Sequence, residues 1–433
     1  MTTPSPKIGA RFGLAASLLL GGALCAAPAL GEDITLKMWT LDNAGYKEFI
    51  AETAAKFKET HPGVTIQHQT FPGDPYKTGL QVALVGSDGP DIFFNWSGDD
   101  AKRLAQDGLA LDITPYSTEP GGFATFLGEG WLSAFEVDGA LYGVPADAVS
   151  KYVFYNTDYF AKHDLSVPAT FDDLLGLCKA VRADSPSTVP MPLGNKTRWK
   201  AVHWMTTLNQ RMVGIEGTAA DYDLSRPADA LYTDPGYAAA FQKLLDAQDA
   251  GCFEDAPNAT DYAIADMMFS SQASPMEYCG SWCTTNQEKA RFKDYAMFRF
   301  PAVTDGKGDP DANFLVPEGY QVSAKTKHPK EAVEWLSFLV NAENAARFTE
   351  LTGLMPSNPE KLDQVEGLSD QFRWIADDVA TFSAGVNVLD VLLPGAVAEA
   401  YLNATVEVLN HTKTPEEAVG MVRAAALEAQ AAQ

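Results

Sequence analysis

Apolar and polar positions near the start of the chain predict strands and helices in alternation. Residues 34–39 alternate apolar and polar side chains, as a half-buried strand does. Apolar residues then recur at helical spacing over 46–57, residues 64–67 predict a second strand, and 74–84 predict a second helix. The apolar run at 91–94 suits a buried parallel strand. This β-α-β-α-β order predicts an α/β layer with a mostly parallel sheet.

These patterns continue to the end of the chain without a visible linker. Residues 152–155 predict a strand and residues 329–340 a helix, while Thr170, in a capping-box pattern, and Thr414 stand where two further helices begin. A chain of 433 residues usually divides into two domains. Because no repeat or linker separates them, we expect a chain that crosses between two lobes more than once.

The N-terminus has the pattern of a cleavable signal peptide. Lys7 and Arg11 precede an apolar run over residues 12–29 that ends in Ala-Pro-Ala. This run is short and rich in Gly and Ala, which disfavours a permanent transmembrane helix. The pattern predicts a signal peptide at residues 1–29, cleavage after Ala29 and a periplasmic location. A lipoprotein modified at Cys25 is the minor alternative.

Charge and motifs disfavour several classes of function. The net charge of −25 at pH 7 repels phosphate backbones, so we expect no nucleic-acid partner. The chain contains no G-x-S-x-G, H-E-x-x-H or P-loop motif. A secreted carbohydrate-active hydrolase or lyase would have to rely on paired carboxylates, and plentiful acidic residues do not by themselves indicate such a pair. We therefore expect a protein that is not an enzyme.

Four cysteines follow the predicted signal peptide, and their even number in an exported chain suggests disulfides. They are Cys178, Cys252, Cys279 and Cys283. Three pairings are possible, and some of the four could be buried thiols. Zinc binding is less favoured because no histidine lies near them in the sequence.

Short motifs occur in a fixed order along nearly the whole chain. They lie at Trp39-Thr40, at 89–94 with 96–98, at 141–145 with 155–160, at Met276 with 280–282, and at 353–357. In order and spacing they resemble those of the extracellular solute-binding proteins of carbohydrate ABC transporters, the maltose-binding-protein-like group.

The resemblance implies the two-lobed periplasmic-binding-protein fold of type II, with a ligand cleft between two α/β lobes. Each lobe would have a mostly parallel sheet flanked by helices. The implied N-terminal lobe comprises residues 30–150 and 301–353, and the C-terminal lobe comprises 151–300 and 354–433. The hinge crossings are expected near Ser150–Asn156, Phe298–Val303 and Thr352–Ser357.

The resemblance also implies a function. The chain would be the periplasmic substrate-binding component of an ABC importer, capturing a sugar, oligosaccharide or polyol and delivering it to permease subunits in the inner membrane. We expect a monomer without cofactor or metal. A periplasmic sensor component that presents its ligand to a receptor is the alternative that sequence does not separate from this one.

A carbohydrate site needs flat aromatic platforms and polar groups that donate and accept hydrogen bonds. Such groups gather at the carboxyl ends of strands, where loops face the crevice. By that rule the first-lobe candidates are Trp39, Asp42, Asn43, Asn95, Trp96, Ser97, Asp99, Asp147, Glu318 and Tyr320. The second-lobe candidates are Arg198, Trp199, Trp204 and Trp282, with His203 on the helical face of Trp199.

Some of these candidates have an equally plain structural interpretation. Asp42 and Ser97 could be helix N-caps, and Trp204 could belong to the core. Trp96 follows a buried strand and precedes Ser-Gly, and Trp282 follows Gly-Ser, where small residues permit close approach of a ligand. We therefore expect Trp96 and Trp282 to be the principal pair of aromatic contacts.

Overall fold

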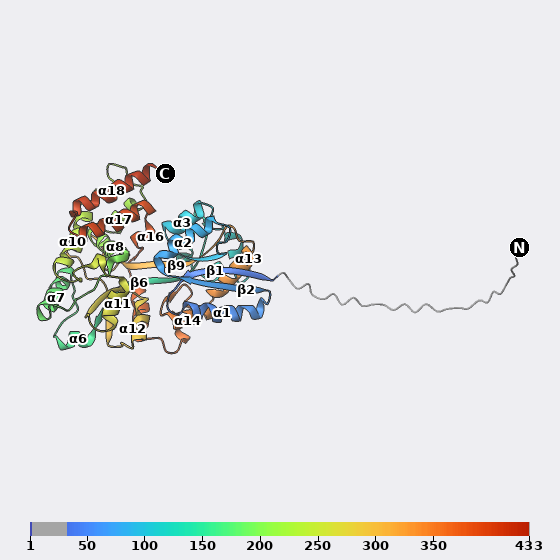
Figure 1. Ribbon diagram of the computed structural model, residues 1–433, viewed down its shortest axis with the longest axis horizontal. Helices are drawn as coiled ribbons and strands as arrows, with labels where there is room; N and C mark the ends of the chain where they lie inside the picture. Colours follow the sequence, from blue (N-terminus) through green and yellow to red (C-terminus); the bar gives the residue numbers. More distant parts are fainter. Residues whose placement is uncertain (2–32, 433) are drawn as a thin grey trace.

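Two long strands join the halves of the molecule (Figure 1). In the computed structural model, which describes Met1 and residues 33–432, β6 (Val144–Asn156) pairs with β9 (Asn313–Val322) up to Ser150. From Lys151 onward β6 pairs instead with β7 (Met276–Gly280) and β8 (Tyr295–Phe298). One continuous strand thus belongs to the sheets of both lobes. The predicted signal peptide lies, apart from Met1, outside the described residues.

The N-terminal sheet has the strand order β10-β6-β9-β3-β1-β2. The strands β1, β2 and β3 run parallel, as predicted, whereas β9 runs antiparallel to both β3 and β6. In the C-terminal lobe β7 and β8 also run antiparallel to β6. The N-terminal sheet is therefore mixed, because β9 and β10 run against the other strands, and in the C-terminal lobe β6 is paired antiparallel on both sides rather than in a mostly parallel sheet. The other strands are β1 (Ile34–Leu41), β2 (Val64–Phe71), β3 (Ile92–Trp96), β4 (Glu136–Val137), β5 (Ala140–Leu141), β10 (Met355–Pro356) and β11 (Gly385–Val386).

Helices cover both lobes. Around the N-terminal sheet lie α1 (Tyr46–Thr60), α2 (Gly73–Val85), α3 (Asp99–Gln106), α4 (Thr114–Ser117), α5 (Glu129–Leu132), α13 (Pro329–Leu339) and α14 (Ala342–Thr352). The remaining helices are α6 (Thr157–Lys162), α7 (Phe171–Asp184), α8 (Trp199–Val213), α9 (Ile215–Tyr222), α10 (Gly236–Asp249), α11 (Tyr262–Ser270), α12 (Cys283–Ala290), α15 (Asp370–Val379), α16 (Leu389–Leu392), α17 (Gly395–Leu409) and α18 (Pro415–Ala431). Both predicted caps are confirmed: Thr170 with Asp173, and Thr414 with Glu417, form capping boxes.

Each lobe has its own apolar core. The N-terminal core includes Phe57 and Trp335, whose rings meet edge to face at 5.3 Å. The C-terminal lobe has a large core around α8, α10 and α17, and a smaller one that contains Phe154 and Phe269. Two separate cores joined by shared strands allow each lobe to stay rigid while the lobes move relative to each other.

Disulfides occur only in the C-terminal lobe of the described chain. They join Cys178 to Cys252 and Cys279 to Cys283, so the structure selects one of the three pairings. The first ties α7 to the segment after α10, and the second joins the end of β7 to the start of α12. Within residues 33–432, no helix combines the length and apolar character needed to cross a membrane.

Candidate functional site

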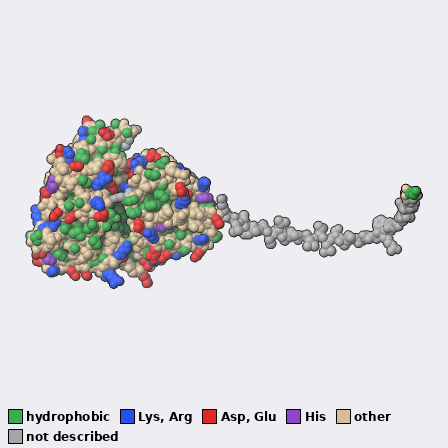
Figure 2. All heavy atoms as spheres, in the orientation of Figure 1, with side chains coloured by type: hydrophobic (Ala, Val, Ile, Leu, Met, Phe, Trp, Pro, Cys, Tyr) green, Lys and Arg blue, Asp and Glu red, His purple; other side chains and the backbone are tan. Residues whose placement is uncertain are grey.

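The candidate site lies where the two lobes face each other. Figure 2 shows the surface hollowed between them. The short helix α16 stands at this junction and contacts both sides. Lys77 of α2 donates from Nζ to the Asp390 carbonyl oxygen at 3.4 Å, while His203 Nε2 of α8 lies 3.7 Å from Asp390 Oδ1. A polar chain thus connects the N-terminal lobe to the C-terminal lobe along the cleft.

Trp96 is the main aromatic side chain of the N-terminal wall. It is the last residue of β3, and its half-buried ring packs edge-on against Phe94 at 5.0 Å. The Lys77 ammonium lies 4.8 Å from the centre of the Trp96 ring. Trp39, in β1, is also half-buried, with its ring 4.6 Å from that of Phe71. The N-terminal sheet therefore holds two aromatic side chains, Trp39 and Trp96, in fixed positions.

A pair of buried carboxyl groups lies behind Trp96. Asp147 of β6 and Glu318 of β9 stand opposite each other in the ladder and are hydrogen-bonded to one another. Tyr46 donates from its hydroxyl to Asp147 Oδ2 at 3.5 Å, and Trp96 stands opposite Glu318 between β3 and β9. Burial raises the pKa of Asp147 to about 7 and holds the pKa of Glu318 well above its usual range. Both carboxyl groups therefore hold a proton more readily than an exposed carboxyl group does.

Asp147 Oδ1 has no hydrogen-bond partner although it is buried. An unpaired buried acceptor costs free energy until a donor reaches it.

Replacing Asp147 with asparagine is expected to reduce the pH dependence of stability. The raised pKa means that the folded protein keeps a proton which the unfolded chain releases above about pH 4. The free energy of unfolding should therefore fall as pH rises from about 4 to about 7, and this fall should be smaller in the variant. The measurement is the melting temperature across that range. Asp229→Asn, at an exposed site, is the control, and identical slopes for wild type and Asp147→Asn would contradict the assignment.

Trp199, His203 and Lys151 form the C-terminal wall. Trp199 begins α8, and its half-buried ring lies 4.8 Å from that of His203. Lys151 Nζ lies 2.9 Å from His203 Nδ1. Burial and the neighbouring Lys151 hold the pKa of His203 well below its usual value, so the imidazole is neutral and accepts this bond from Lys151. Burial, followed by the charge of Lys200, likewise lowers the pKa of Lys151.

Trp282 completes this wall. Its half-buried ring lies 6.4 Å from that of Trp199, in an edge-to-face arrangement. It packs against both the N-terminal core and the smaller C-terminal core. Trp39 and Trp96 on the N-terminal side and Trp199 and Trp282 on the C-terminal side thus flank the junction at α16, where Lys77 and the neutral His203 both approach Asp390. Such a site suits a neutral ligand that has apolar faces and hydroxyl groups.

Comparison with known proteins places the chain in a family. A family model for bacterial extracellular solute-binding proteins matches residues 52–378, which is most of the chain. The chain belongs to this family.

Relatives of this solute-binding protein cover most of its length. The maltodextrin-binding protein MdxE of Bacillus subtilis (strain 168) is 26% identical over 354 residues, covering 80% of this chain and 79% of that one. The multiple sugar-binding protein of Streptococcus mutans serotype c is 22% identical over 306 residues, covering 69% of each.

Solved structures share its fold. A chitin oligosaccharide binding protein superposes with a TM-score of 0.82 at 21% identity, covering 93% of this chain and 100% of that one. A Thermus thermophilus maltotriose binding protein with bound maltotriose gives 0.73 at 21% identity, covering 91% and 99%. These likenesses confirm the predicted two-lobed fold of type II.

Trp204 does not belong to the cleft. It is 1% exposed and lies inside the C-terminal core, where its ring contacts Phe253, Tyr278 and Phe300 at 5.0–5.5 Å. The prediction of a ligand contact at Trp204 is therefore wrong. The reason is that α8 is buried on every side beyond its first residue, so its inward and cleft-facing positions look alike in the sequence.

Three first-lobe candidates are occupied by internal contacts. Asn95 donates from Nδ2 to Gln321 Oε1 at 2.8 Å, and its Oδ1 accepts from the Trp96 amide at 3.0 Å. Ser97 is buried and its Oγ accepts from Asn387 at 3.2 Å. Tyr320 packs within the N-terminal core. The solute-binding protein therefore uses these side chains to hold the wall in place, and a ligand contact at Asn95, Ser97 or Tyr320 stays a prediction.

The other candidates lie at the rim. Asn43 is exposed, and Asp42 is also exposed and forms an ion pair with Lys47 at 2.9 Å. The hydrogen bond from Lys47 and, more weakly, the charge of Lys289 across the cleft lower the pKa of Asp42. Asp99 is half-buried at the start of α3, where burial raises its pKa.

Arg198 is also held at the rim. Its guanidinium contacts both carboxylate oxygens of Glu399, at 2.6 and 3.3 Å, and Asn403 Oδ1 at 2.9 Å. Its backbone has a φ of 66°, which orients the start of α8. The bidentate ion pair leaves few of its donors for a ligand.

Sequence reasoning missed Lys77, Lys151 and Asp390. The signal that could have identified Lys151 is a single lysine inside the apolar run 149–155. A charged residue there must either be paired or mark a functional site. Lys77 and Asp390 carry no such signal, because each stands in a segment that resembles an ordinary helix or loop.

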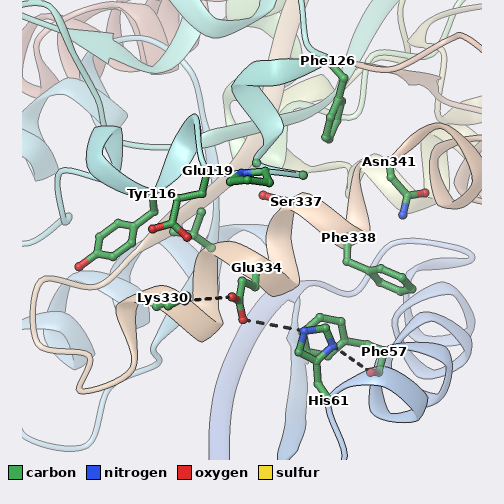
Figure 3. A pocket seen from close by; sticks show the side chains of 14 residues that line it. Phe57, His61, Tyr116, Glu119, Phe126, Lys330, Glu334, Ser337, Phe338 and Asn341 are labelled. Carbon is green, nitrogen blue, oxygen red and sulfur yellow. Dashed lines mark hydrogen bonds and ion pairs between the residues drawn. The ribbon is translucent and has the colours of Figure 1, made fainter.

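A cavity of about 420 Å³ lies elsewhere in the N-terminal lobe (Figure 3). The rings of Phe57 and His61 stack with their centres 3.9 Å apart. The Glu334 carboxylate lies 3.9 Å from His61 Nε2 and 3.8 Å from Lys330 Nζ. Every residue lining it comes from this lobe, and none is a predicted site residue. Closure of the cleft would not change this cavity, so it is not the candidate ligand site.

Proposed function

We propose that this solute-binding protein is the periplasmic substrate-binding component of an ABC importer and captures a neutral sugar, oligosaccharide or polyol in the interlobe cleft. The observation that carries the proposal is the placement of Trp39 and Trp96 on one wall and Trp199 and Trp282 on the other. Rings on both sides can cover the apolar faces of a sugar ring, and buried carboxyl groups discriminate in favour of hydroxyls.

The relatives support the ligand class. The two curated proteins bear the names of maltodextrin-binding and multiple sugar-binding proteins, and the two solved structures are named for chitin oligosaccharide and maltotriose. The family consists of solute-binding proteins rather than enzymes, which agrees with the lack of catalytic motifs in the sequence. Export through residues 1–29, a monomeric state and delivery to membrane permease subunits belong to the same proposal.

We also propose that the lobes close about three crossings, with residues 30–150 and 301–353 forming one lobe and 151–300 and 354–433 the other. The change of partners in β6 after Ser150 supports the first crossing. Val303 packs in the C-terminal core and Phe314 in the N-terminal core, which favours a second crossing after Val303, later than the expected Phe298–Val303, and a first-lobe segment that begins after Val303 rather than at residue 301. Ligand bound to one lobe favours closure only through the contacts that it gains with the other.

The test is thermal unfolding of residues 30–433 against sugars, polyols, amino acids, inorganic anions and metals. A ligand that binds only the folded state adds about 2.7 kcal/mol of stability at a hundredfold excess over its Kd, which gives a clear rise in melting temperature. The proposal predicts a rise with at least one neutral saccharide or polyol. A response confined to amino acids, anions or metals would contradict it.

A further inference from the structure

The loop that carries Trp282 is closed by a disulfide. Cys279 lies in β7 and Cys283 is the first residue of α12, and both are completely buried. Their bond spans Gly280, Ser281 and Trp282, so the two ends of this short loop are covalently joined. The position of the Trp282 backbone is therefore fixed from both sides.

Within the loop, Trp282 folds back over Gly280. A Cβ atom at Gly280 would lie 1.9 Å from Trp282 Cζ3, so no larger residue fits beneath the ring. The indole consequently rests on the backbone of the same loop that the disulfide closes. Any shift in the separation of Cys279 and Cys283 would move the surface on which the ring rests.

The loop is also tied to the crossing strand. The Ser281 amide donates to the Ser150 carbonyl oxygen at 2.8 Å, and the Ser150 amide donates to Ser281 Oγ at 3.4 Å. Ser150 is the residue after which β6 changes partners between the lobes. Because Trp282 packs against cores of both lobes, the loop lies at the junction that must move when the cleft closes.

The disulfide rests on a buried charged group. Lys200 Nζ lies 2.7 Å from Asp266, 3.6 Å from Glu277 and 3.8 Å from Cys279 Sγ. Cys283 Sγ lies 4.0 Å from Glu277. Two separate thiols occupy more space than two bonded sulfurs, and this packed, charged floor leaves them little room. Breaking the disulfide should therefore displace the Trp282 loop rather than Lys200, Asp266 and Glu277.

We propose that the Cys279–Cys283 disulfide positions Trp282 as a ligand platform, so that ligand affinity depends on whether this bond is formed. The inference rests on the proposed function. Reduction by an external dithiol breaks the protein S–S bond and forms one in the reductant, and the two protons of the dithiol pass to Cys279 and Cys283. Cys279 and Cys283 are positioning residues, because they act through Trp282.

The protein contains a matched control in its other disulfide. Cys178 and Cys252 lie in the large C-terminal core, away from the Trp282 loop. Both double variants, Cys279→Ser with Cys283→Ser and Cys178→Ser with Cys252→Ser, should lower the melting temperature, since each loses a crosslink. Only the first should weaken binding of the saccharide found by thermal unfolding, by about tenfold, because the released Trp282 must be reordered on binding.

A double-mutant cycle separates positioning from general damage. In a Trp282→Ala background, loss of the Cys279–Cys283 bond should cause no further loss of affinity. An additional loss of the same size in that background, or unchanged affinity with Trp282 present, would overturn the proposal. Failure of wild type to bind any saccharide would instead refute the proposed function.

A readout without ligand keeps the inference testable in either case. The fluorescence of Trp282 is obtained as the difference between proteins with and without Trp282→Phe. Acrylamide should quench this fluorescence more strongly when Cys279 and Cys283 are replaced, because the indole becomes more accessible. The quenching should stay unchanged when Cys178 and Cys252 are replaced. Reduction of the Cys178→Ser, Cys252→Ser protein with dithiothreitol gives the same comparison without a substitution in the loop. Unchanged quenching in both cases would overturn the positioning role.

Discussion

Replacing Trp282 with alanine is expected to weaken saccharide binding by about 10- to 100-fold, or roughly 1.4–2.8 kcal/mol, the range for loss of a stacked aromatic contact with its buried area. The ring belongs to the C-terminal lobe yet packs against the N-terminal core. Its removal would therefore reduce both direct contact with the ligand and the contacts that favour closure. Calorimetric titration with the saccharide found by thermal unfolding measures the effect.

Trp374→Ala is the control for this substitution. Trp374 is 37% exposed and packs against Tyr152 at 5.1 Å, outside the two aromatic walls. Its loss should leave the Kd within about twofold of wild type, since surface substitutions have small effects. A folded Trp282→Ala protein with wild-type affinity would show that Trp282 does not contact the ligand.

Replacing Trp204 with alanine is expected to lower the free energy of unfolding by about 3–5 kcal/mol, the range for large aromatic residues removed from a core. Its ring is enclosed by Phe253, Tyr278 and Phe300, so the substitution leaves a cavity that these neighbours only partly fill. The measurement is urea unfolding at 25 °C, with Trp374→Ala again as the control.

The folded fraction of the Trp204→Ala protein should bind its ligand with nearly unchanged affinity, because Trp204 touches neither wall. This outcome separates stability from binding at two tryptophans of the same helix, Trp199 and Trp204. A loss of stability no larger than that of Trp374→Ala would refute the core assignment. A loss of affinity without a loss of stability would indicate that Trp204 does contact the ligand.

Local patterns predicted the elements well because each pattern has a local cause. Apolar periodicity identified α1 and α13, and side-chain capping identified the starts of α7 and α18. The direction of β9 could not be predicted in this way. The direction of β9 depends on how the chain returns from the other lobe. The residues on either side of a strand do not determine which strands it pairs with.

The candidate site was harder to predict because its contacts join distant parts of the chain. Lys77 and Asp390 are 313 residues apart, and no local pattern connects them. Glu318 and Asp147 were both predicted, but their pairing follows only from the register of β6 and β9. Trp199 and Trp204 differ in role because one begins α8 and the other lies within it, a distinction that depends on tertiary packing.

The interlobe cleft differs from the cavity beside Phe57 in one decisive respect. Residues of both lobes meet there, with Lys77 against Asp390 and Trp282 against the N-terminal core, so a ligand there can change the relative position of the lobes. The cavity is bounded by a single lobe and offers no such coupling. A binding protein that signals its occupancy to a membrane partner requires the first kind of site.

Calorimetric titration of residues 30–433 with neutral saccharides and polyols tests the central claim most directly. We expect saturable binding of at least one of them, with one molecule bound per chain and the saccharide recovered chemically unchanged. Absence of binding across the whole set would contradict the assignment of the cleft as a sugar-binding site, and recovery of a cleaved saccharide would contradict the assignment of the chain as a binding protein rather than an enzyme.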